Sequence, residues 1–263
     1  MEKKKVLVVG CNGRMGQLVC EAIAKSEDFE VTGGYDVEYI QEMYKFPVFT
    51  STKEMESWQD VYNFDVIIDF SRPEATMSVL EFADEQEIPM VIATTGFSDE
   101  QEKKIRNTAK YIPIFKSDNM SYGIYVARQL VKLMAKLIPY CDDFSIDESH
   151  QSTKKDAPSG TAKNLFFNDI NEAYGNKLVP NYGGTEQKQP NEVWMSSRRV
   201  KDADGEHTIT FGLPGESISV HTITHNSSVY AEGALEAARY LLEFCGCAGY
   251  YTMDDMSEDM QDN

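Results

Sequence analysis

Residues 6–19 read VLVVGCNGRMGQLV, and this stretch decides the fold. Its four leading apolar residues are typical of a strand that is buried on both faces of a parallel sheet. Gly10, Gly13 and Gly16 follow, and glycines between a strand and a helix let a pyrophosphate approach the backbone N–H groups at the helix start. The spacing is GxxGxxG, a variant of the usual GxGxxG. The stretch predicts dinucleotide binding, and a purely structural tight turn is the alternative.

The alternation of apolar strand and amphipathic helix continues through the first 120 residues. The segments KVLVVG, FEVTGGYD, FDVIIDFS, IPMVIATT and YIPIFKSD are predicted strands, and helices are expected over residues 15–25, 74–85 and 99–110. Ser71 is a candidate cap for the second of these helices. Such alternation predicts right-handed crossovers and a doubly wound α/β domain.

The pattern changes after residue 120. GIYVARQLVKLMAKLIPY predicts a long amphipathic helix, with Val126, Leu130, Leu133 and Leu137 on one face. A further helix is expected over about residues 159–174. EVWMSSRRV, EHTITFGL and ESISVHTITHN alternate polar and apolar residues, which predicts a mixed sheet with two different faces.

We therefore expect an α/β protein with two domains. A Rossmann-type parallel-sheet domain is predicted over residues 1–120, and the helix in YAEGALEAARYLLEFC would return to complete it over residues 230–263. A smaller α+β domain with a mixed sheet is predicted over residues 121–229.

Composition narrows the function classes. The net charge is −18 and the pI is about 4.6, so nucleic acid and anionic membranes would be repelled and neither is an expected partner. No apolar run approaches the ~20 residues that span a bilayer. Five scattered cysteines, an odd number, indicate reduced thiols in a cytoplasm. Without CxxC or HxxxH spacing, no metal site is predicted.

Polar residues at the ends of predicted strands are further candidates, because ligands bind along that edge of such sheets. Asp36 follows the second strand, where a carboxylate would accept hydrogen bonds from ribose hydroxyls. It would repel a 2′-phosphate, and residues 37–39 supply no arginine or lysine, so we expect NADH to be preferred over NADPH; Lys53 is the one cation that could oppose this. DFSRP (residues 69–73) and TTGF (residues 94–97) are similar polar clusters, with ordinary loop chemistry as the alternative.

The stretch DESHQSTKKDAPSGTAKNLF, residues 147–166, places its cations just before a predicted helix start. Asp156 or Ser159 can cap that helix, and the small residues after the cap leave backbone N–H groups unshielded, as in an anion site. His150 and Lys154 are four residues apart, so one compact turn would put both beside the anion. A capped surface helix with solvated lysines is the alternative.

ESHQSTKKDAPSGTA closely resembles the E-x-H-H-x-x-K-x-D-A-P-S-G-T-A signature of the 4-hydroxy-tetrahydrodipicolinate (dihydrodipicolinate) reductase family. The segments VGCNGRMG, VIIDFSRPEAT, VIATTGF, SDNMSYG and GEHTITF are similar to that family's segments as well. The resemblance implies an oxidoreductase of lysine and diaminopimelate biosynthesis, which uses NADH or NADPH to reduce a cyclic imine that carries two carboxylates. It also implies a homotetramer, with residues 121–229 as the substrate-binding and oligomerisation domain.

The resemblance assigns roles residue by residue. His150 and Lys154 would form the catalytic pair. The substrate would be held by Gln151, Lys154, Ser159, Gly160 and Thr161. The cofactor would be held by Gly10, Asn12, Gly13, Arg14, Met15, Gly16, Asp36, Phe70, Ser71, Thr94, Thr95, Gly96, Asn119, Met120 and Ser121. Gln151 departs from the family pattern, which has a second histidine there.

Two other function classes stay open on the sequence. A different Rossmann dehydrogenase, acting on an amino or hydroxy acid, would share the first domain but has no reason to contain DAPSGTA. A dinucleotide-sensing module without catalysis would keep the glycines and lack the pair of His150 and Lys154. Oxidation of the cofactor with freshly generated substrate separates the three.

Overall fold

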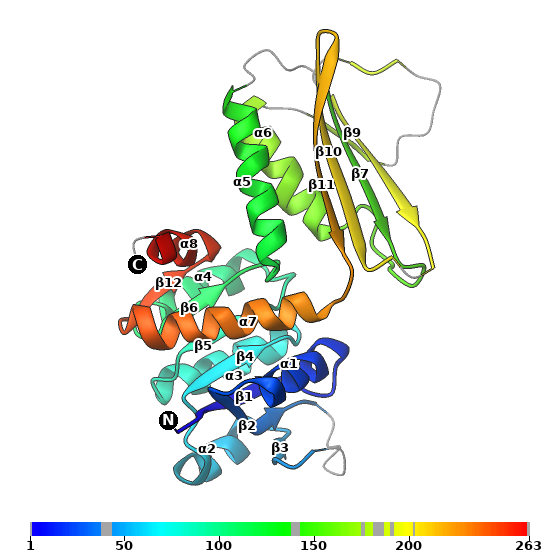
Figure 1. Cartoon of the computed structure of the whole chain (residues 1–263). Coiled ribbons are helices and arrows are strands. Elements are labelled where there is room, and N and C mark those ends of the chain that lie inside the picture. Colours follow the sequence, from blue (N-terminus) through cyan, green and yellow to red (C-terminus); the bar gives the residue numbers. More distant parts are fainter. Residues whose placement is uncertain are drawn as a thin grey trace. The chain divides into compact units, whose positions relative to one another are not determined.

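Figure 1 shows the computed structural model of the chain. It describes residues 2–37, 44–137, 143–174, 177–180, 187–189, 192–201 and 203–261. The chain divides into two compact units. Unit 1 comprises Met1–Met120 and Ser228–Asn263, and unit 2 comprises Ser121–Ser227.

Unit 1 is built on a parallel sheet of seven strands in the order β12-β6-β5-β4-β1-β2-β3. The strands are β1 (Lys4–Val9), β2 (Phe29–Tyr35), β3 (Val48–Phe49), β4 (Val66–Asp69), β5 (Met90–Ile92), β6 (Pro113–Lys116) and β12 (Gly249–Tyr251). The helices are α1 (Arg14–Lys25), α2 (Thr52–Tyr62), α3 (Pro73–Glu85), α4 (Asp99–Thr108), α7 (Ser228–Tyr240), the π-helical turn η3 (Leu241–Cys245) and α8 (Met253–Gln261). The predicted Rossmann-type sheet and its five strands in residues 1–120 are confirmed.

The continuous apolar character of β1 follows from helices on both faces of the sheet. Leu7 and Val9 belong to a core cluster with side chains from α2, α3 and α4. Val6 and Val8 point to the opposite face, because side chains alternate along a strand, and they are also fully buried. On that face α1 packs on β1 and β2, while α7 packs on α1, β4 and β5.

The C-terminal segment completes unit 1. β12 adds a parallel strand beside β6. Arg239 of α7 binds Asp28, which precedes β2, with Nη2 and Oδ1 3.1 Å apart. Gly233 of α7 lies directly against the Met120 carbonyl, where a Cβ would come within 1.8 Å of the oxygen. These contacts join segments from opposite ends of the sequence.

Helix starts in unit 1 show one departure from the sequence analysis. Ser98 caps α4 in a capping box with Gln101. Ser71 was a candidate cap for α3, and this was wrong, because Arg72 occupies the N-cap position without a side-chain cap. The Ser71 hydroxyl instead donates to Asp69, since a buried carboxylate needs hydrogen bonds more than an exposed helix end does.

Unit 2 holds a five-stranded sheet in the order β11-β10-β7-β9-β8. Its strands are β7 (Asp143–His150), β8 (Lys177–Pro180), β9 (Glu192–Arg199), β10 (Gly205–Leu213) and β11 (Glu216–Thr224). Its helices are α5 (Tyr122–Leu137), the π-helix η2 (Thr161–Phe167) and α6 (Asn168–Tyr174). β10 is antiparallel to β7 and β11, whereas β7, β8 and β9 are mutually parallel. The predicted mixed sheet is confirmed.

Helix α5 packs on a face other than the one that the sequence singled out. Its buried residues include Ile124, Ala127, Val131 and Ala135, which join Phe144, Phe211 and others in the core of unit 2. Val126, Leu130, Leu133 and Leu137, the predicted apolar face, are between 41% and 70% exposed. The helix is apolar on both sides, and its alanines select the packing face because they allow a close approach. The predicted helix also covered residues 138–140, which lie outside the described residues.

Candidate active site

The turn from β1 to α1 depends on glycine at two positions. Gly10 has a positive φ of 77°, which favours glycine, and its N–H donates to the Tyr35 carbonyl at 2.8 Å. A Cβ on Gly16 would lie 2.1 Å from the Gly10 carbonyl oxygen. The backbone of the loop therefore packs directly on the first turn of α1, and this is the close approach that a dinucleotide loop needs.

The start of α1 carries an electrostatic bias that the start of α4 lacks. Gly13 stands at its N-cap without a side-chain cap, and its first turn holds no acidic residue. By contrast, α4 has both a capping box and three acids in its first turn. The partial positive charge at the N-terminus of α1 is therefore not offset by its own side chains. Arg14 and Met15, both predicted cofactor residues, lie in this first turn.

Asp36 lies beside the glycine loop. One carboxylate oxygen accepts a hydrogen bond from the Asn12 N–H at 2.9 Å, and the other accepts from the Val37 N–H at 2.8 Å. The acid at the end of β2 is thereby held next to the loop that precedes α1, and its role toward a ribose stays a prediction. Residues 38 and 39, which that argument also used, lie outside the described residues.

A pocket of about 530 Å³ opens at this edge of the sheet. It is lined by Gly10, Asn12, Gly13, Tyr35, Asp36, Val37, Phe70, Ser71, Arg72, Glu74 and Ala75. Six of the predicted cofactor residues therefore share one cavity. Two lining residues were not predicted to bind the cofactor: Arg72 lies inside the polar cluster recognised at residues 69–73, and Glu74 directly follows it.

Asp69, the first residue of that cluster, was given no role of its own, and it organises two neighbouring strand ends. Its buried carboxylate accepts from the backbone N–H of Ser71 at 3.0 Å and from the hydroxyls of Ser71 and Thr76. Burial raises the pKa of Asp69 to about 6. The Ser71 N–H also donates to the hydroxyl oxygen of Thr94, which lies just after β5, at 2.9 Å. Thr95 and Gly96 follow and are exposed.

The last predicted cofactor residues stand where unit 1 gives way to unit 2. The Ser117 hydroxyl donates to the Asn119 carbonyl at 2.8 Å. Met120 is only 1% exposed. The hydroxyl of Ser121 accepts from the Ile124 N–H at 3.3 Å, at the start of α5. The side chain of Met120 is thus part of the core of unit 1.

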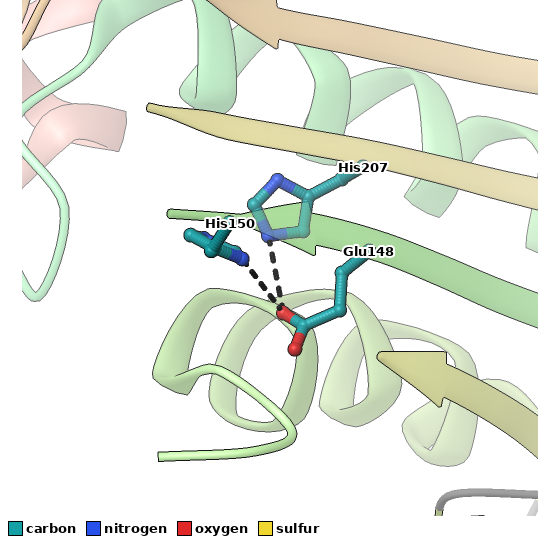
Figure 2. Close-up of side chains that lie close together, drawn as sticks. All are labelled: Glu148, His150 and His207. Carbon is teal, nitrogen blue, oxygen red and sulfur yellow. Dashed lines mark ion pairs between the residues drawn. The ribbon is translucent and has the colours of Figure 1, made fainter. Parts of the chain in front are cut away.

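Figure 2 shows the central side-chain cluster of unit 2, formed by Glu148, His150 and His207. Glu148 and His150 lie two residues apart on β7, so they face the same side of the sheet, and His207 of β10 pairs with Glu148 in register. The Glu148 Oε2 atom is 3.4 Å from His150 Nδ1 and 3.8 Å from His207 Nε2. All three side chains are buried.

Burial sets the protonation of the two histidines. It lowers the pKa of His207 to about 4, with the neighbouring His150 acting in the same direction and Glu148 opposing. It also lowers the pKa of His150; Glu148 opposes this shift, whereas the charges of Lys154 and Arg199 add to it. Both imidazoles are therefore held neutral by their surroundings at neutral pH.

This leads to an expected pH dependence of stability. His207 has its ordinary pKa of 6.5 in the unfolded chain, whereas its pKa is lowered to about 4 in the folded protein. Its contribution to the free energy of unfolding is therefore complete above pH 6.5 and is lost as the pH falls toward 4. The loss amounts to roughly 3 kcal/mol. We expect His207→Gln to reduce the decline in the free energy of unfolding over this range, measured by urea denaturation at successive pH values.

His221→Gln is the matched control for that experiment, because His221 is an exposed histidine on the neighbouring strand β11. It should leave the acid-induced decline as it is in the unaltered protein. An equal decline in the His207→Gln protein would contradict the assignment.

The loop after β7 is tied to the cluster through Ser159. The Ser159 N–H donates to both carboxylate oxygens of Glu148, at 3.0 and 3.1 Å. Its hydroxyl accepts from the Ala162 N–H at 3.1 Å, so Ser159 rather than Asp156 caps the following helix. Asp156 instead forms an ion pair with Lys154, whose Nζ is 2.9 Å away. Within the same turn, the backbone N–H of Lys154 donates a hydrogen bond to the Gln151 carbonyl oxygen at 3.0 Å.

Arg199 is a residue of this region that the sequence analysis missed. The parallel register of β7 and β9 places it opposite His150. Its guanidinium donates to the carbonyl oxygens of Lys154, at 3.3 Å, and of Asp156, and lies 3.6 Å from Glu148. Arg199 therefore clamps the backbone of the loop that carries Lys154. Only the tertiary pairing of β9 reveals this contact.

The cluster also offers a set of metal donors, since one atom from each of Glu148, His150 and His207 lies within 4.8 Å of the others. Hydrogen bonds from Ser159 already satisfy part of this cluster, however. Both Glu148 oxygens accept from the Ser159 N–H, and the Ser159 hydroxyl lies 3.3 Å from His207 Nε2. We therefore interpret the three side chains as a buried cluster that Ser159 links through Glu148 and His207, with Nδ1 of His150 left without a hydrogen bond. The absence of a metal site stays a prediction.

Comparison with known proteins follows the same division of the chain. Residues 4–120 match the family model described as dihydrodipicolinate reductase, N-terminus, and residues 123–256 match dihydrodipicolinate reductase, C-terminus. The chain belongs to the dihydrodipicolinate reductase family. The resemblance seen in the sequence is thereby confirmed.

Relatives in this family match over almost their whole length. A 4-hydroxy-tetrahydrodipicolinate reductase of Caldanaerobacter subterraneus is 38% identical, with 96% of this chain and 97% of the relative covered. One from Clostridium novyi is 35% identical over the same shares. A dipicolinate-bound dihydrodipicolinate reductase of a Paenisporosarcina species has the same fold, with a TM-score of 0.76 at 22% identity over 95% of this chain and 98% of that one.

Within the described part of the chain, no helix is both long enough and apolar enough to cross a membrane. Cys11, Cys20 and Cys247 are free thiols.

Proposed function

We propose that the protein reduces 4-hydroxy-tetrahydrodipicolinate to tetrahydrodipicolinate with a nicotinamide dinucleotide, in the biosynthesis of lysine and diaminopimelate. The observation that carries the proposal is the buried His150 beside the loop of Lys154, at the capped helix start of the DAPSGTA segment. Membership of the dihydrodipicolinate reductase family supports the same reaction.

The substrate half of the site would lie in unit 2, with Gln151, Lys154, Ser159, Gly160 and Thr161 around the carboxylates. A protein of net charge −18 repels a dianion at long range. A local cation is therefore needed, and Lys154 supplies it on a half-buried side chain whose present partner is Asp156. A substrate carboxylate would compete with Asp156 for that ammonium group, and Arg199 would hold the loop backbone in place meanwhile.

The cofactor half would lie in unit 1. The glycine loop has the tight turn and close helix packing of a dinucleotide-binding loop, because a side chain at Gly10 or Gly16 would collide with neighbouring backbone atoms. The pyrophosphate would sit at residues 10–16, over the uncapped start of α1. Phe70, Ser71, Thr94, Thr95, Gly96, Asn119, Met120 and Ser121 would complete the site toward the nicotinamide.

In this reaction the main chemical role of the protein's own side chains would be to donate one proton. A bound nicotinamide dinucleotide would supply the hydride, which is delivered to carbon 4 of the ring with overall loss of water. Negative charge develops on the conjugated system as hydride arrives, and a general acid nearby neutralises it. Lys154 would donate this proton with the assistance of His150.

A coupled assay tests the reaction itself. Substrate generated freshly from pyruvate and aspartate semialdehyde by a dihydrodipicolinate synthase is added with NADH or NADPH, and the cofactor's absorbance is followed. We expect cofactor oxidation that depends on the substrate and is inhibited by pyridine-2,6-dicarboxylate. Oxidation with an amino or hydroxy acid alone would favour another dehydrogenase, and cofactor binding without turnover would favour a sensing module.

The preference between cofactors gives a separate prediction. Asp36 would accept the ribose hydroxyls and repel a 2′-phosphate, so NADH should bind more tightly than NADPH. Asp36→Ala removes this repulsion, so the Kd values for NADH and NADPH should become more similar, or NADPH should become the tighter ligand. Arg72 lines the same pocket and would be available to bind the 2′-phosphate. Fluorescence titration of both cofactors at two salt concentrations measures the ratio. Tighter NADPH binding to the unaltered protein would overturn the prediction.

Assembly and location follow from the family and from the thiols. A homotetramer in the cytoplasm is proposed, with unit 2 as the substrate-binding and oligomerisation domain. Multi-angle light scattering of the purified protein measures the number of subunits directly.

A further inference from the structure

Glu148 is a buried carboxylate that the proposed reaction leaves without a role. Its side chain is 0% exposed, and it lies on the same face of β7 as His150. Burying a carboxylate is costly unless it is paired and hydrogen-bonded. The single N–H of Ser159 contacts both carboxylate oxygens and provides part of that compensation. The imidazoles of His150 and His207 both lie next to one oxygen of the same carboxylate (Figure 2).

We propose that Glu148 is a positioning residue, which holds the Nδ1–H of His150 toward its carboxylate and leaves Nε2 of that ring to meet the substrate. The inference rests on the proposed function, because it takes His150 to act on the substrate. A neutral imidazole has one N–H, and the hydrogen bond at one ring nitrogen decides which nitrogen carries it. A carboxylate accepts only, so it selects the tautomer with the proton on the facing nitrogen.

The geometry around His150 supports this orientation. Nδ1 is buried and has no aligned hydrogen-bond partner, and the Glu148 oxygen lies 3.4 Å away. That separation is long for a hydrogen bond, but catalytic contacts in ligand-free enzymes commonly tighten only when the substrate binds. A small rotation of the ring would close it and satisfy the orphaned nitrogen.

The other ring nitrogen lies beside a glycine. Gly205 stands at the start of β10, and a Cβ there would lie 3.5 Å from Nε2 of His150, which is an ordinary van der Waals distance. The two ring nitrogens point in different directions, so contact of Nδ1 with Glu148 turns Nε2 away from the carboxylate.

Glu148 also links His150 to the helix start that would bind the substrate. The backbone N–H of Ser159 fixes the carboxylate, and Ser159 begins the segment that would surround the substrate carboxylates. Several charged or titratable groups face His150: Glu148 from β7, His207 from β10, Arg199 from β9, and Lys154 and Asp156 from the loop. Among these, the Glu148 carboxylate is the group that contacts Nδ1.

Glu148→Gln is the informative variant. The Ser159 N–H still needs an acceptor, so the new amide oxygen would turn to Ser159 and the amide NH₂ to His150. Nδ1 would then have to accept, and the imidazole would switch to the Nε2–H tautomer. We expect kcat to fall at least about tenfold with the cofactor Kd unchanged. The acidic limb of the kcat/KM profile, where the neutral imidazole becomes protonated, should move to lower pH, because Glu148 favours protonated His150.

Glu206→Gln is the matched control. Glu206 pairs with His221 at 2.9 Å across the same sheet, on exposed side chains of β10 and β11. The same chemical change at this Glu–His pair should leave kcat and the pH profile as in the unaltered protein. A loss equal to that of Glu148→Gln would show a general effect of altering the sheet, and the positioning role would be overturned.

The tautomer is read independently of turnover by ¹⁵N–¹H correlation spectra of the histidine rings in the full chain. In the unaltered protein His150 should be the neutral Nδ1–H form, and an Nε2–H form there would overturn the proposal even if the Glu148→Gln protein failed to fold. If His150→Gln kept full kcat, the catalytic role of His150 would fail instead, while the ring spectra would still decide whether Glu148 orients the imidazole.

Discussion

Lys154→Met is expected to lower kcat by about 10²- to 10⁴-fold, the range that general-acid catalysis contributes. Methionine keeps the length and apolar stem of lysine but offers no proton and no charge. His150→Gln should act in the same direction, because the two side chains are coupled through their charges. Stopped-flow measurement of NADH oxidation with saturating substrate separates the change in kcat from that in KM.

Lys155→Met provides the control for this pair of variants. Lys155 is the adjacent lysine and its side chain is exposed, so the same substitution removes one charge from the same loop without removing the proposed acid. We expect its kcat to equal that of the unaltered protein, and the cofactor Kd of all three variants to be preserved. Near-normal kcat in both Lys154→Met and His150→Gln would refute the catalytic assignment.

Gly16→Ala is expected to abolish tight cofactor binding and to destabilise unit 1. The added Cβ would come 2.1 Å from the Gly10 carbonyl oxygen and 2.7 Å from its carbonyl carbon. Both are backbone atoms, so relief requires movement of the whole glycine loop or of the first turn of α1. Overpacking of this kind typically costs about 1–3 kcal/mol, and here we expect the upper end. Thermal unfolding and NADH titration report the two effects.

Gly123→Ala serves as the comparison, because a Cβ there would meet only the Ser121 hydroxyl, at 3.7 Å, in the first turn of α5. An alanine at this site is sterically ordinary and improves helix propensity. It should leave the melting temperature unchanged or slightly raised. Equal melting temperatures for Gly16→Ala and the unaltered protein would show that the loop is not packed on α1 as described.

The strand pattern of unit 1 was readable from sequence because burial on both faces leaves continuous apolar runs such as residues 6–9. The buried face of α5 could not be predicted in this way, because the helix carries apolar residues on both sides. Leu130 and Leu133 look like core residues to any periodicity argument, yet they are 47% and 50% exposed. The core instead takes the face that carries Ala127 and Ala135, which the larger apolar side chains of the opposite face outweigh in a periodicity argument.

The site shows a similar limit. His150 and Lys154 stand close in sequence and within a recognisable signature, so they could be named in advance. Arg199 comes to their loop through the parallel pairing of β7 and β9, and His207 comes to Glu148 through the antiparallel pairing of β7 and β10. Residue type and spacing do not encode such registers; they follow from the assembled sheet.

The division of unit 1 into two chain segments has a consequence for biosynthesis on the ribosome. β6 gains its outer neighbour β12, and α1 gains its partner α7, only after all of Ser121–Ser227 has been made. Until then the nascent sheet leaves apolar surface of β4 and β5 uncovered and β6 as an open edge, which are the features that recruit chaperones or promote aggregation. Unit 2 is continuous in sequence and escapes this delay, so a chain truncated shortly after residue 227 would keep the elements of unit 2 and lose those that close unit 1.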